Sequence, residues 1–144
     1  MINQSEEYTE KAFKVVDAIE ELHYIKECDI QFVVLTSDEE KKKAGKIIYA
    51  DCRKVNKYYE WCCPYEFLIT MYMPNCELLS DEQINILLWH ELKHIGVDMS
   101  NGEPVYMVNP HEIEDFKSII DRFGYDWEEE GKVLPDVLGG DADG

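Results

Sequence analysis

The residues best suited to chemistry lie at positions 90–94, where the sequence reads His-Glu-Leu-Lys-His. On a helix, this H-E-x-x-H spacing places His90 and His94 one turn apart on the same face. Their imidazole nitrogens can then converge on one Zn²⁺ ion. Glu91 would project to the side of the metal, where it can take a proton from a metal-bound water and pass it to a leaving amine. The motif predicts two metal ligands and a general base.

A catalytic zinc site also needs a third protein ligand and one open position. The downstream candidates are Asp98, Glu103, His111, Glu112, Glu114 and Asp115. His111 follows Asn109-Pro110, a pair typical of a helix start, and stands in the first turn of the helix expected there. Glu112 lies closer than His111 to the apolar stripe of that helix, so it stays open as the alternative third ligand.

Two further residues could assist the same chemistry. Asp115 could accept the second ring N–H of a ligand histidine and so orient it. Tyr106 lies between the motif and His111 in the sequence and could donate a hydrogen bond to the transition-state oxyanion. A purely structural alternative remains, in which His90 and His94 are hydrogen-bonded residues at the edge of the core.

The motif falls in a segment with clear helix signals. Ser80 and Gln83 form a capping box, which predicts a helix from position 81 to about 95 with Gly96 as its C′ residue. Asn101-Gly102 then predicts a turn that could be the tip of a hairpin. The helix starting at Asn109-Pro110 carries one apolar face and ends near Gly124.

The elements before the motif must position this helix. Residues 6–24 read as an amphipathic helix, and residues 38–43 as a loop or short helical turn. Apolar, β-branched runs predict strands at 30–35, 46–55 and 67–73. If the third strand lies at the site, it could pair with an extended peptide. This order predicts an α+β fold with an N-terminal helix, a small three- to four-stranded mixed or antiparallel sheet, the motif helix and a C-terminal helix.

Length and composition fit one small domain. The 144 residues predict a single domain over 1–127, followed by an acidic, turn-rich tail over 128–144. Lys plus Arg is 14 and Asp plus Glu is 31, giving a net charge of −17. This charge argues against non-specific binding to nucleic acid or anionic membranes, and it would favour divalent cations and basic peptides in a cleft. The one dense basic cluster is Lys41-Lys42-Lys43.

The sequence favours a cytoplasmic protein with reduced thiols. Its longest apolar runs fall short of the ~20 residues that cross a bilayer, and its first ten residues are polar and acidic, unlike a signal peptide. An odd number of cysteines without disulfide-like spacing points to free thiols whose roles stay open. They are Cys28, Cys52, Cys62, Cys63 and Cys76.

Three segments together resemble the putative phage metallopeptidase family, small zincin-like proteins of phages and bacterial mobile elements. They read PYEF at 64–67, LLWHELKHIG at 87–96 and PHEIEDFKSIIDRFGYDW at 110–127. The resemblance is clearest from the third expected strand to Trp127. It implies a compact zincin-like core and zinc-dependent hydrolysis, and it favours His111 as the third ligand.

The leading expectation is therefore a zinc metallopeptidase with one Zn²⁺ per chain and a peptide or protein substrate. The net charge supports a rival from another class, an acidic interaction protein, with or without a stabilising metal, that could mimic nucleic acid. A metal-dependent hydrolase of a non-peptide substrate is the third hypothesis. The oligomeric state, the cleaved bond and the native metal stay open.

Overall fold

The computed structural model describes residues 1–110 and residue 138. Its main sheet has four strands in the order β1 (Ile2–Gln4), β2 (Phe32–Ser37), β6 (Phe67–Tyr72) and β5 (Ala50–Lys54). The central strands β2 and β6 are parallel, with Phe32 opposite Phe67, and the outer strands are antiparallel to their neighbours. The α+β class and the small mixed sheet predicted from the sequence are confirmed.

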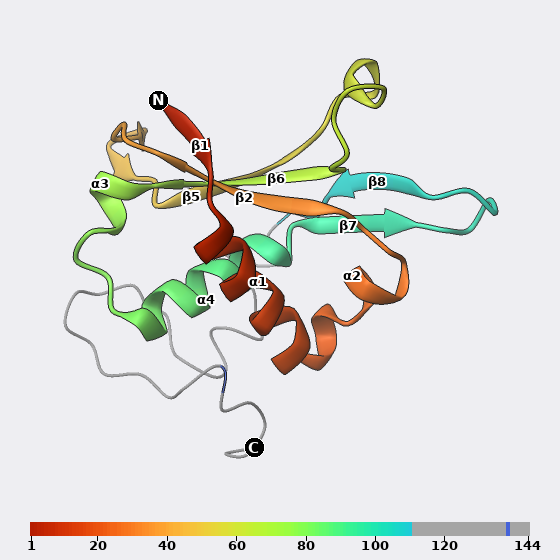
Figure 1. The fold of residues 1–144 in the computed structure, drawn as a ribbon, viewed down its shortest axis with the longest axis horizontal. Coiled ribbons are helices and arrows are strands. Elements are labelled where there is room, and N and C mark those ends of the chain that lie inside the picture. Colours follow the sequence, from red (N-terminus) through yellow and green to blue (C-terminus); the bar gives the residue numbers. More distant parts are fainter. Residues whose placement is uncertain (111–137, 139–144) are drawn as a thin grey trace.

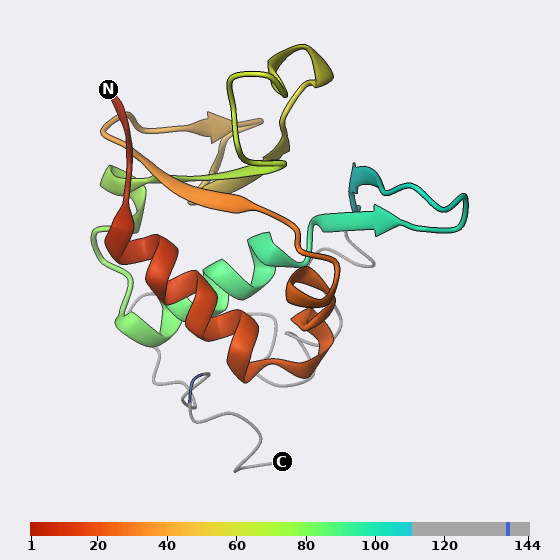
Figure 2. The same ribbon diagram turned by 45° about the vertical axis from the view of Figure 1, so that its right-hand side comes forward.

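Two helices lie side by side against one face of this sheet (Figures 1 and 2). They are α1 (Glu6–Ala18) and the motif helix α4 (Asp81–Leu92). The core between helices and sheet includes fully buried Val16, Ile69 and Leu88. Burial of such an aliphatic side chain contributes about 1.5–3 kcal/mol relative to leaving it exposed. The core therefore fixes where α4 presents its motif.

The first helix is shorter than the sequence pattern predicts. It begins at Ser5, whose side chain accepts a hydrogen bond from the Tyr8 amide, and it ends at Ala18. Ile19 leaves the helix with extended dihedral angles, and the chain continues through the 3₁₀ turn η1 (Glu20–Leu22) and the short helix α2 (Tyr24–Glu27). Leu22 and Ile25 are buried after this break. Their packing outweighs the helical periodicity that suggested one helix to position 24.

The strand predicted at 46–55 is interrupted. Its first part belongs to a hairpin of β3 (Lys42–Lys43) and β4 (Lys46–Ile47), and β5 begins only at Ala50. The loop or helical turn expected at 38–43 was therefore wrong for its last two residues. Ala44 and Gly45 have φ angles of 52° and 80°, the left-handed pair that a tight two-residue hairpin turn requires.

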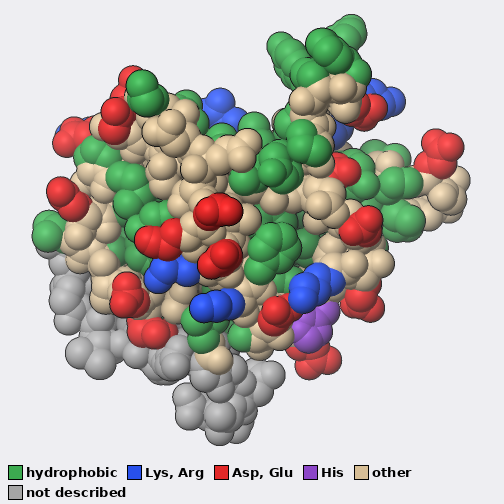
Figure 3. Space-filling view, viewed as in Figure 1, with side chains coloured by type: hydrophobic (Ala, Val, Ile, Leu, Met, Phe, Trp, Pro, Cys, Tyr) green, Lys and Arg blue, Asp and Glu red, His purple; other side chains and the backbone are tan. Residues whose placement is uncertain are grey.

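A protruding loop separates β5 from β6 and contains the 3₁₀ turn η2 (Lys57–Tyr59) (Figure 1). Its aromatic side chains are strongly exposed, with Tyr58 at 82% and Trp61 at 83%. The space-filling view shows apolar atoms gathered on this loop, while acidic side chains are scattered over the rest of the same face (Figure 3). After β6 the chain enters the short helix α3 (Met73–Cys76), with proline in its first turn.

A second hairpin, β7 (Ile95–Asp98) and β8 (Val105–Val108), follows α4. Gly102 adopts a φ of 83° at its tip, so the turn predicted at Asn101-Gly102 is confirmed. The predicted C-terminal helix, the domain boundary at 127 and, apart from residue 138, the acidic tail lie outside the described residues. No helix in the described part of the chain is long and apolar enough to cross a membrane.

Candidate active site

The motif helix begins as predicted and ends earlier. The Ser80 hydroxyl accepts from the Gln83 amide at 3.2 Å, and the Gln83 side chain accepts from the Ser80 amide at 2.8 Å, completing the capping box. The helix ends at Leu92 rather than near Ile95. His94 therefore lies in the turn that follows, where its amide donates to the Glu91 carbonyl at 3.0 Å.

This tight turn still brings the two motif histidines together. The ring centroids of His90 and His94 lie 5.3 Å apart, with their planes at 68°. Glu91 is buried, with 4% of its surface exposed, and its Oε2 lies 3.9 Å from His90 Nε2. The structure places these three residues close together, although His94 lies in a turn where the sequence predicted continuous helix.

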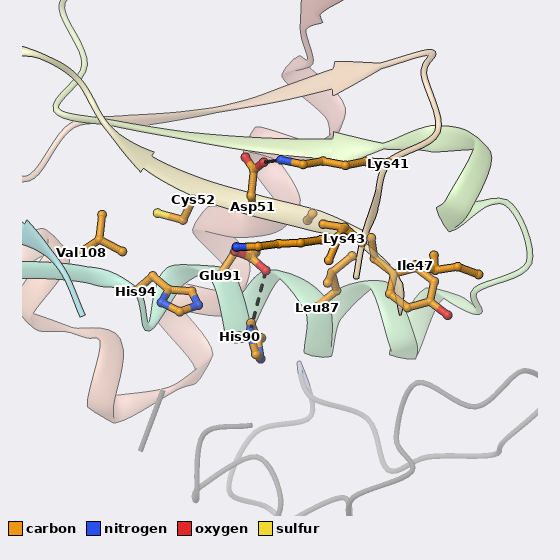
Figure 4. A pocket seen from close by; sticks show the side chains of 13 residues that line it. Lys41, Lys43, Ile47, Asp51, Cys52, Leu87, His90, Glu91, His94 and Val108 are labelled. Atoms are coloured by element: carbon orange, nitrogen blue, oxygen red, sulfur yellow. Dashed lines mark hydrogen bonds and ion pairs between the residues drawn. The ribbon is translucent and has the colours of Figure 1, made fainter. Parts of the chain in front are cut away.

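The three residues line a cavity of about 340 Å³ between α4, the edge strand β5 and the β3–β4 hairpin (Figure 4). Its lining includes Asp51 and Cys52 of β5, and Lys43 and Ile47 of the hairpin. A carboxylate, two imidazoles and an open volume thus lie together at one edge of the sheet. This arrangement can hold a small substrate segment next to a candidate base.

The backbone after β8 orients His94. Its Nδ1 lies 2.6 Å from the backbone carbonyl oxygen of Asn109, and the backbone N–H of Asn109 donates to the His94 carbonyl at 2.7 Å. Because a carbonyl oxygen can only accept, Nδ1 carries the proton and Nε2 of the neutral ring carries the lone pair. Metal-binding histidines are typically held by this kind of second hydrogen bond. His94 is therefore oriented as a metal ligand would be.

The Asn109 side chain holds the same junction. Its Nδ2 donates to the carbonyls of Lys93 and Ile95, both at 3.2 Å. Gly96 allows this approach, since a Cβ added there would lie 2.8 Å from Met107 Cγ and 2.9 Å from Asn109 Cγ. The prediction of Gly96 as a helix C′ residue was wrong. It is instead a strand residue that makes room for Asn109.

Side chains from the N-terminal region fix the end of α4 from another direction. Glu21 accepts from Trp89 Nε1 at 2.8 Å and pairs with Lys93 Nζ at 3.1 Å. The Tyr24 hydroxyl donates to the Ile95 carbonyl, and burial raises the pKa of Tyr24, which keeps the phenol protonated as a donor. The turn that contains His94 is thus held on both sides.

The β3–β4 hairpin is attached to the sheet by a polar network. Asp51 Oδ2 accepts from Lys41 Nζ and from the Tyr72 hydroxyl, each at 2.7 Å. Burial alone would raise the pKa of Asp51, but these two hydrogen bonds hold it below its usual value. Asn75 Nδ2 donates to the carbonyls of Lys41 and Ile48, which closes the base of the hairpin.

One residue and one strand that the sequence placed at the site lie elsewhere. Tyr106 packs edge to face on Phe67 with centroids 6.0 Å apart, and it lines a separate groove beside Glu66. The third predicted strand, now β6, cannot offer an edge to a peptide because β2 and β5 pair with both of its sides. That suggestion was wrong, and β5 is the strand beside the motif.

The remaining predicted site residues lie outside the described part of the chain. These are His111, Glu112 and Asp115. Within residues 1–110, no group of three or more His, Cys, Asp or Glu side chains could hold a metal ion. The five cysteines are free thiols, and burial raises the pKa of Cys52 in the cavity. The described residues offer a metal ion one oriented imidazole, that of His94, and the neighbouring ring of His90, and such a site needs a further ligand.

Sequence reasoning missed Asn109 as a positioning residue and the hairpin lysines as part of the cavity. Asn109 was read only as a helix N-cap, although its place after a predicted hairpin could have suggested contact with the end of the motif. The lysines carried a signal as the one dense basic cluster.

The family model described as "putative phage metallopeptidase" matches residues 1–134. The comparisons with curated proteins and with solved structures gave no match. The family match spans the four-stranded sheet, the motif helix and both hairpins, and it extends through His111, Glu112 and Asp115. The chain therefore belongs to the putative phage metallopeptidase family.

Proposed function

We propose that this protein is a zinc-dependent metallopeptidase in which His90, His94 and His111 hold one Zn²⁺ per chain. The observation that carries this proposal is the hydrogen bond between His94 Nδ1 and the Asn109 carbonyl, which leaves the lone pair on Nε2. His90 lies next to that ring, and Glu91 is buried beside both. Membership in a metallopeptidase family supports a peptide or protein substrate.

In this mechanism, the zinc ion, Glu91 and the Asn109 carbonyl would have separate roles. A bound zinc ion would supply Lewis acidity, which lowers the pKa of an attacking water toward neutrality. Glu91 would accept a proton from that water and later give it to the leaving amine. The Asn109 carbonyl would keep His94 in one tautomer throughout. Because Glu91 is buried, its carboxylate is held close to His90 rather than turned to solvent.

The third ligand comes from the segment that follows Asn109-Pro110. His111 is proposed because an imidazole completes the ligand set typical of catalytic zinc. Glu112 is the alternative, and Asp115 is proposed to orient one of the histidines. Tyr106 as a donor to the oxyanion stays a prediction from the sequence that its place in a separate groove does not support.

The position of β5 suggests how a peptide would lie. In the described part of the chain, β5 is an outer strand of the main sheet, and it lies directly against α4. An extended peptide could pair with the backbone of β5 and so cross the cavity in front of Glu91. The site would then recognise an unfolded or flexible segment of its substrate.

The decisive variant is Glu91→Gln. We expect it to keep one zinc ion per chain and to lose at least about 100-fold in cleavage rate, because the base is removed while the histidines remain. Cleavage would be followed by mass spectrometry on a proteome-derived peptide mixture, with exposed Glu77→Gln as the matched control. Full activity of Glu91→Gln would contradict the mechanism. An acidic interaction protein would not need Glu91, so the same comparison separates that rival.

A further inference from the structure

The β3–β4 hairpin brings positive charge to the cavity of a chain whose net charge is −17. Four of the fourteen basic residues lie within positions 41–46. They are Lys41, Lys42, Lys43 and Lys46. Lys41 and Lys43 are both lining residues of the cavity that contains Glu91. Figure 4 shows the Lys43 side chain reaching along it from the hairpin, whereas the Lys41 side chain lies beside Asp51. The local charge therefore differs from the charge of the whole molecule.

The two cavity lysines are not equivalent. Lys41 is engaged by Asp51 and the Tyr72 hydroxyl, so its charge is compensated within the protein. Lys43 is exposed and forms no ion pair with the described residues. Glu91 is buried and Asp51 is neutralised by Lys41. Among the charged side chains that line the cavity, Lys43 is thus the one presented to an incoming ligand.

The hairpin that carries Lys43 is held in place. At the base of the hairpin, the Asn75 side chain donates to the carbonyls of Lys41 and Ile48, and the Ile48 backbone N–H donates to the Lys41 carbonyl at 3.0 Å. At its tip, Ala44 and Gly45 form the turn with left-handed φ angles. The backbone under Lys43 is therefore ordered before any ligand binds, and less entropy is lost when its ammonium group meets a partner.

We propose that Lys43 makes this cleft select peptides with an acidic side chain next to the cleaved bond. This inference rests on the proposed peptidase function and names its substrate class. A carboxylate placed in a partly enclosed cleft beside Lys43 would gain a charge-assisted hydrogen bond. The net charge of the chain led to the opposite expectation, a preference for basic peptides, and the cavity lining overrides it at short range.

The direction of β5 relates the way a peptide pairs with it to the side of the cleaved bond that lies near Lys43. β5 runs from Ala50, near the hairpin, to Lys54 at its far end. A peptide that pairs antiparallel with β5 would place its C-terminal residues at the Ala50 end. For a peptide in this antiparallel direction, the acidic residue selected by Lys43 is expected C-terminal to the cleaved bond.

The test compares Lys43→Glu with Lys42→Glu, which makes the same charge change on the same hairpin outside the cavity lining. Each variant and the wild type would be given matched synthetic peptides, found by library cleavage, that differ only by Glu or Lys at one position. We expect the wild type to prefer the Glu peptide about fivefold in kcat/KM. Lys43→Glu should shift that preference about tenfold toward the Lys peptide, while Lys42→Glu should keep it.

Peptide binding to the Glu91→Gln variant, measured by fluorescence anisotropy, should show the same preference without turnover. Three results would overturn the inference alone: cleavage without charge preference, an equal shift in both lysine variants, or a preference that disappears when the peptide C-terminus is amidated. The last result would assign the ligand as a terminal carboxylate. A wild type that binds zinc but cleaves and binds no peptide would overturn the proposed function, and this inference with it.

Discussion

The two hairpins beside the motif helix are anchored in the same way but hold different residues in place. In each, one asparagine side chain donates to two backbone carbonyls: Asn109 to Lys93 and Ile95, and Asn75 to Lys41 and Ile48. The β7–β8 hairpin uses this anchor to hold the turn that contains His94. The β3–β4 hairpin uses it to hold lysines at the cavity.

We infer from this difference that the two hairpins have separate tasks. The β7–β8 side determines the orientation of a candidate metal ligand through backbone atoms. In our proposal, the β3–β4 side determines the charge that a substrate meets, through the side chains of its lysines. The comparison predicts that damage to the β7–β8 hairpin removes metal binding, whereas damage to the β3–β4 hairpin changes substrate choice.

Among the variants that test this difference between the hairpins, Gly96→Ala should have the largest effect on stability and zinc affinity. The added methyl group would overlap Asn109 and Met107, so we expect a loss of about 3 kcal/mol in unfolding free energy. Zinc affinity should fall by at least about 100-fold, because the displaced Asn109 and Met107 side chains would disturb the backbone that positions His94. Chemical denaturation and zinc titration would measure both.

Gly102→Ala is the matched control at the tip of the same hairpin. A Cβ there meets nothing within 4 Å, although its φ of 83° strains any other residue. We expect about 1 kcal/mol of destabilisation and unchanged zinc affinity. Equal zinc affinities for the two glycine variants would contradict the positioning role of the Gly96 region.

A milder change is Asn109→Ala, which removes two hydrogen bonds and keeps the backbone carbonyl that faces His94. We expect a loss of about 2 kcal/mol in stability and about tenfold in zinc affinity, since the carbonyl is no longer held in place. Zinc affinity equal to that of the wild type would show that the Asn109 side chain does not position the ligand.

The smallest expected effect belongs to the equivalent change on the other hairpin, Asn75→Ala. It should cost about 1 kcal/mol of stability and leave zinc affinity unchanged. The preference for acidic peptides should weaken, because Lys43 is then carried by a looser hairpin. A tenfold loss of zinc affinity in Asn75→Ala would erase the distinction between the hairpins.

Local signals predicted those parts of the fold that depend on neighbouring residues. The capping box at Ser80, the turn at Asn101-Gly102 and the apolar runs of β2 and β6 were all read correctly. Each depends on side chains within a few positions of one another, so the sequence pattern contains the needed information.

Contacts between distant residues decided what the sequence pattern could not. The motif helix ends at Leu92 because Asn109, fifteen residues beyond His94, pairs with the His94 backbone. The helix predicted to reach position 24 breaks after Ala18, where Leu22 and Ile25 turn into the core. No periodicity in either segment encodes these partners. That His90, Glu91 and His94 lie close together was predictable, because it depends only on their separation along the sequence.

The central claim is that the motif histidines hold one zinc ion, and the most direct test is metal content per chain. Native mass spectrometry after equilibration with zinc would be applied to the wild type, His94→Ala, His111→Ala and Glu112→Ala. We predict one zinc ion per wild-type chain, none for His94→Ala and His111→Ala, and one for Glu112→Ala. A wild-type chain that is folded and carries no zinc would contradict the claim.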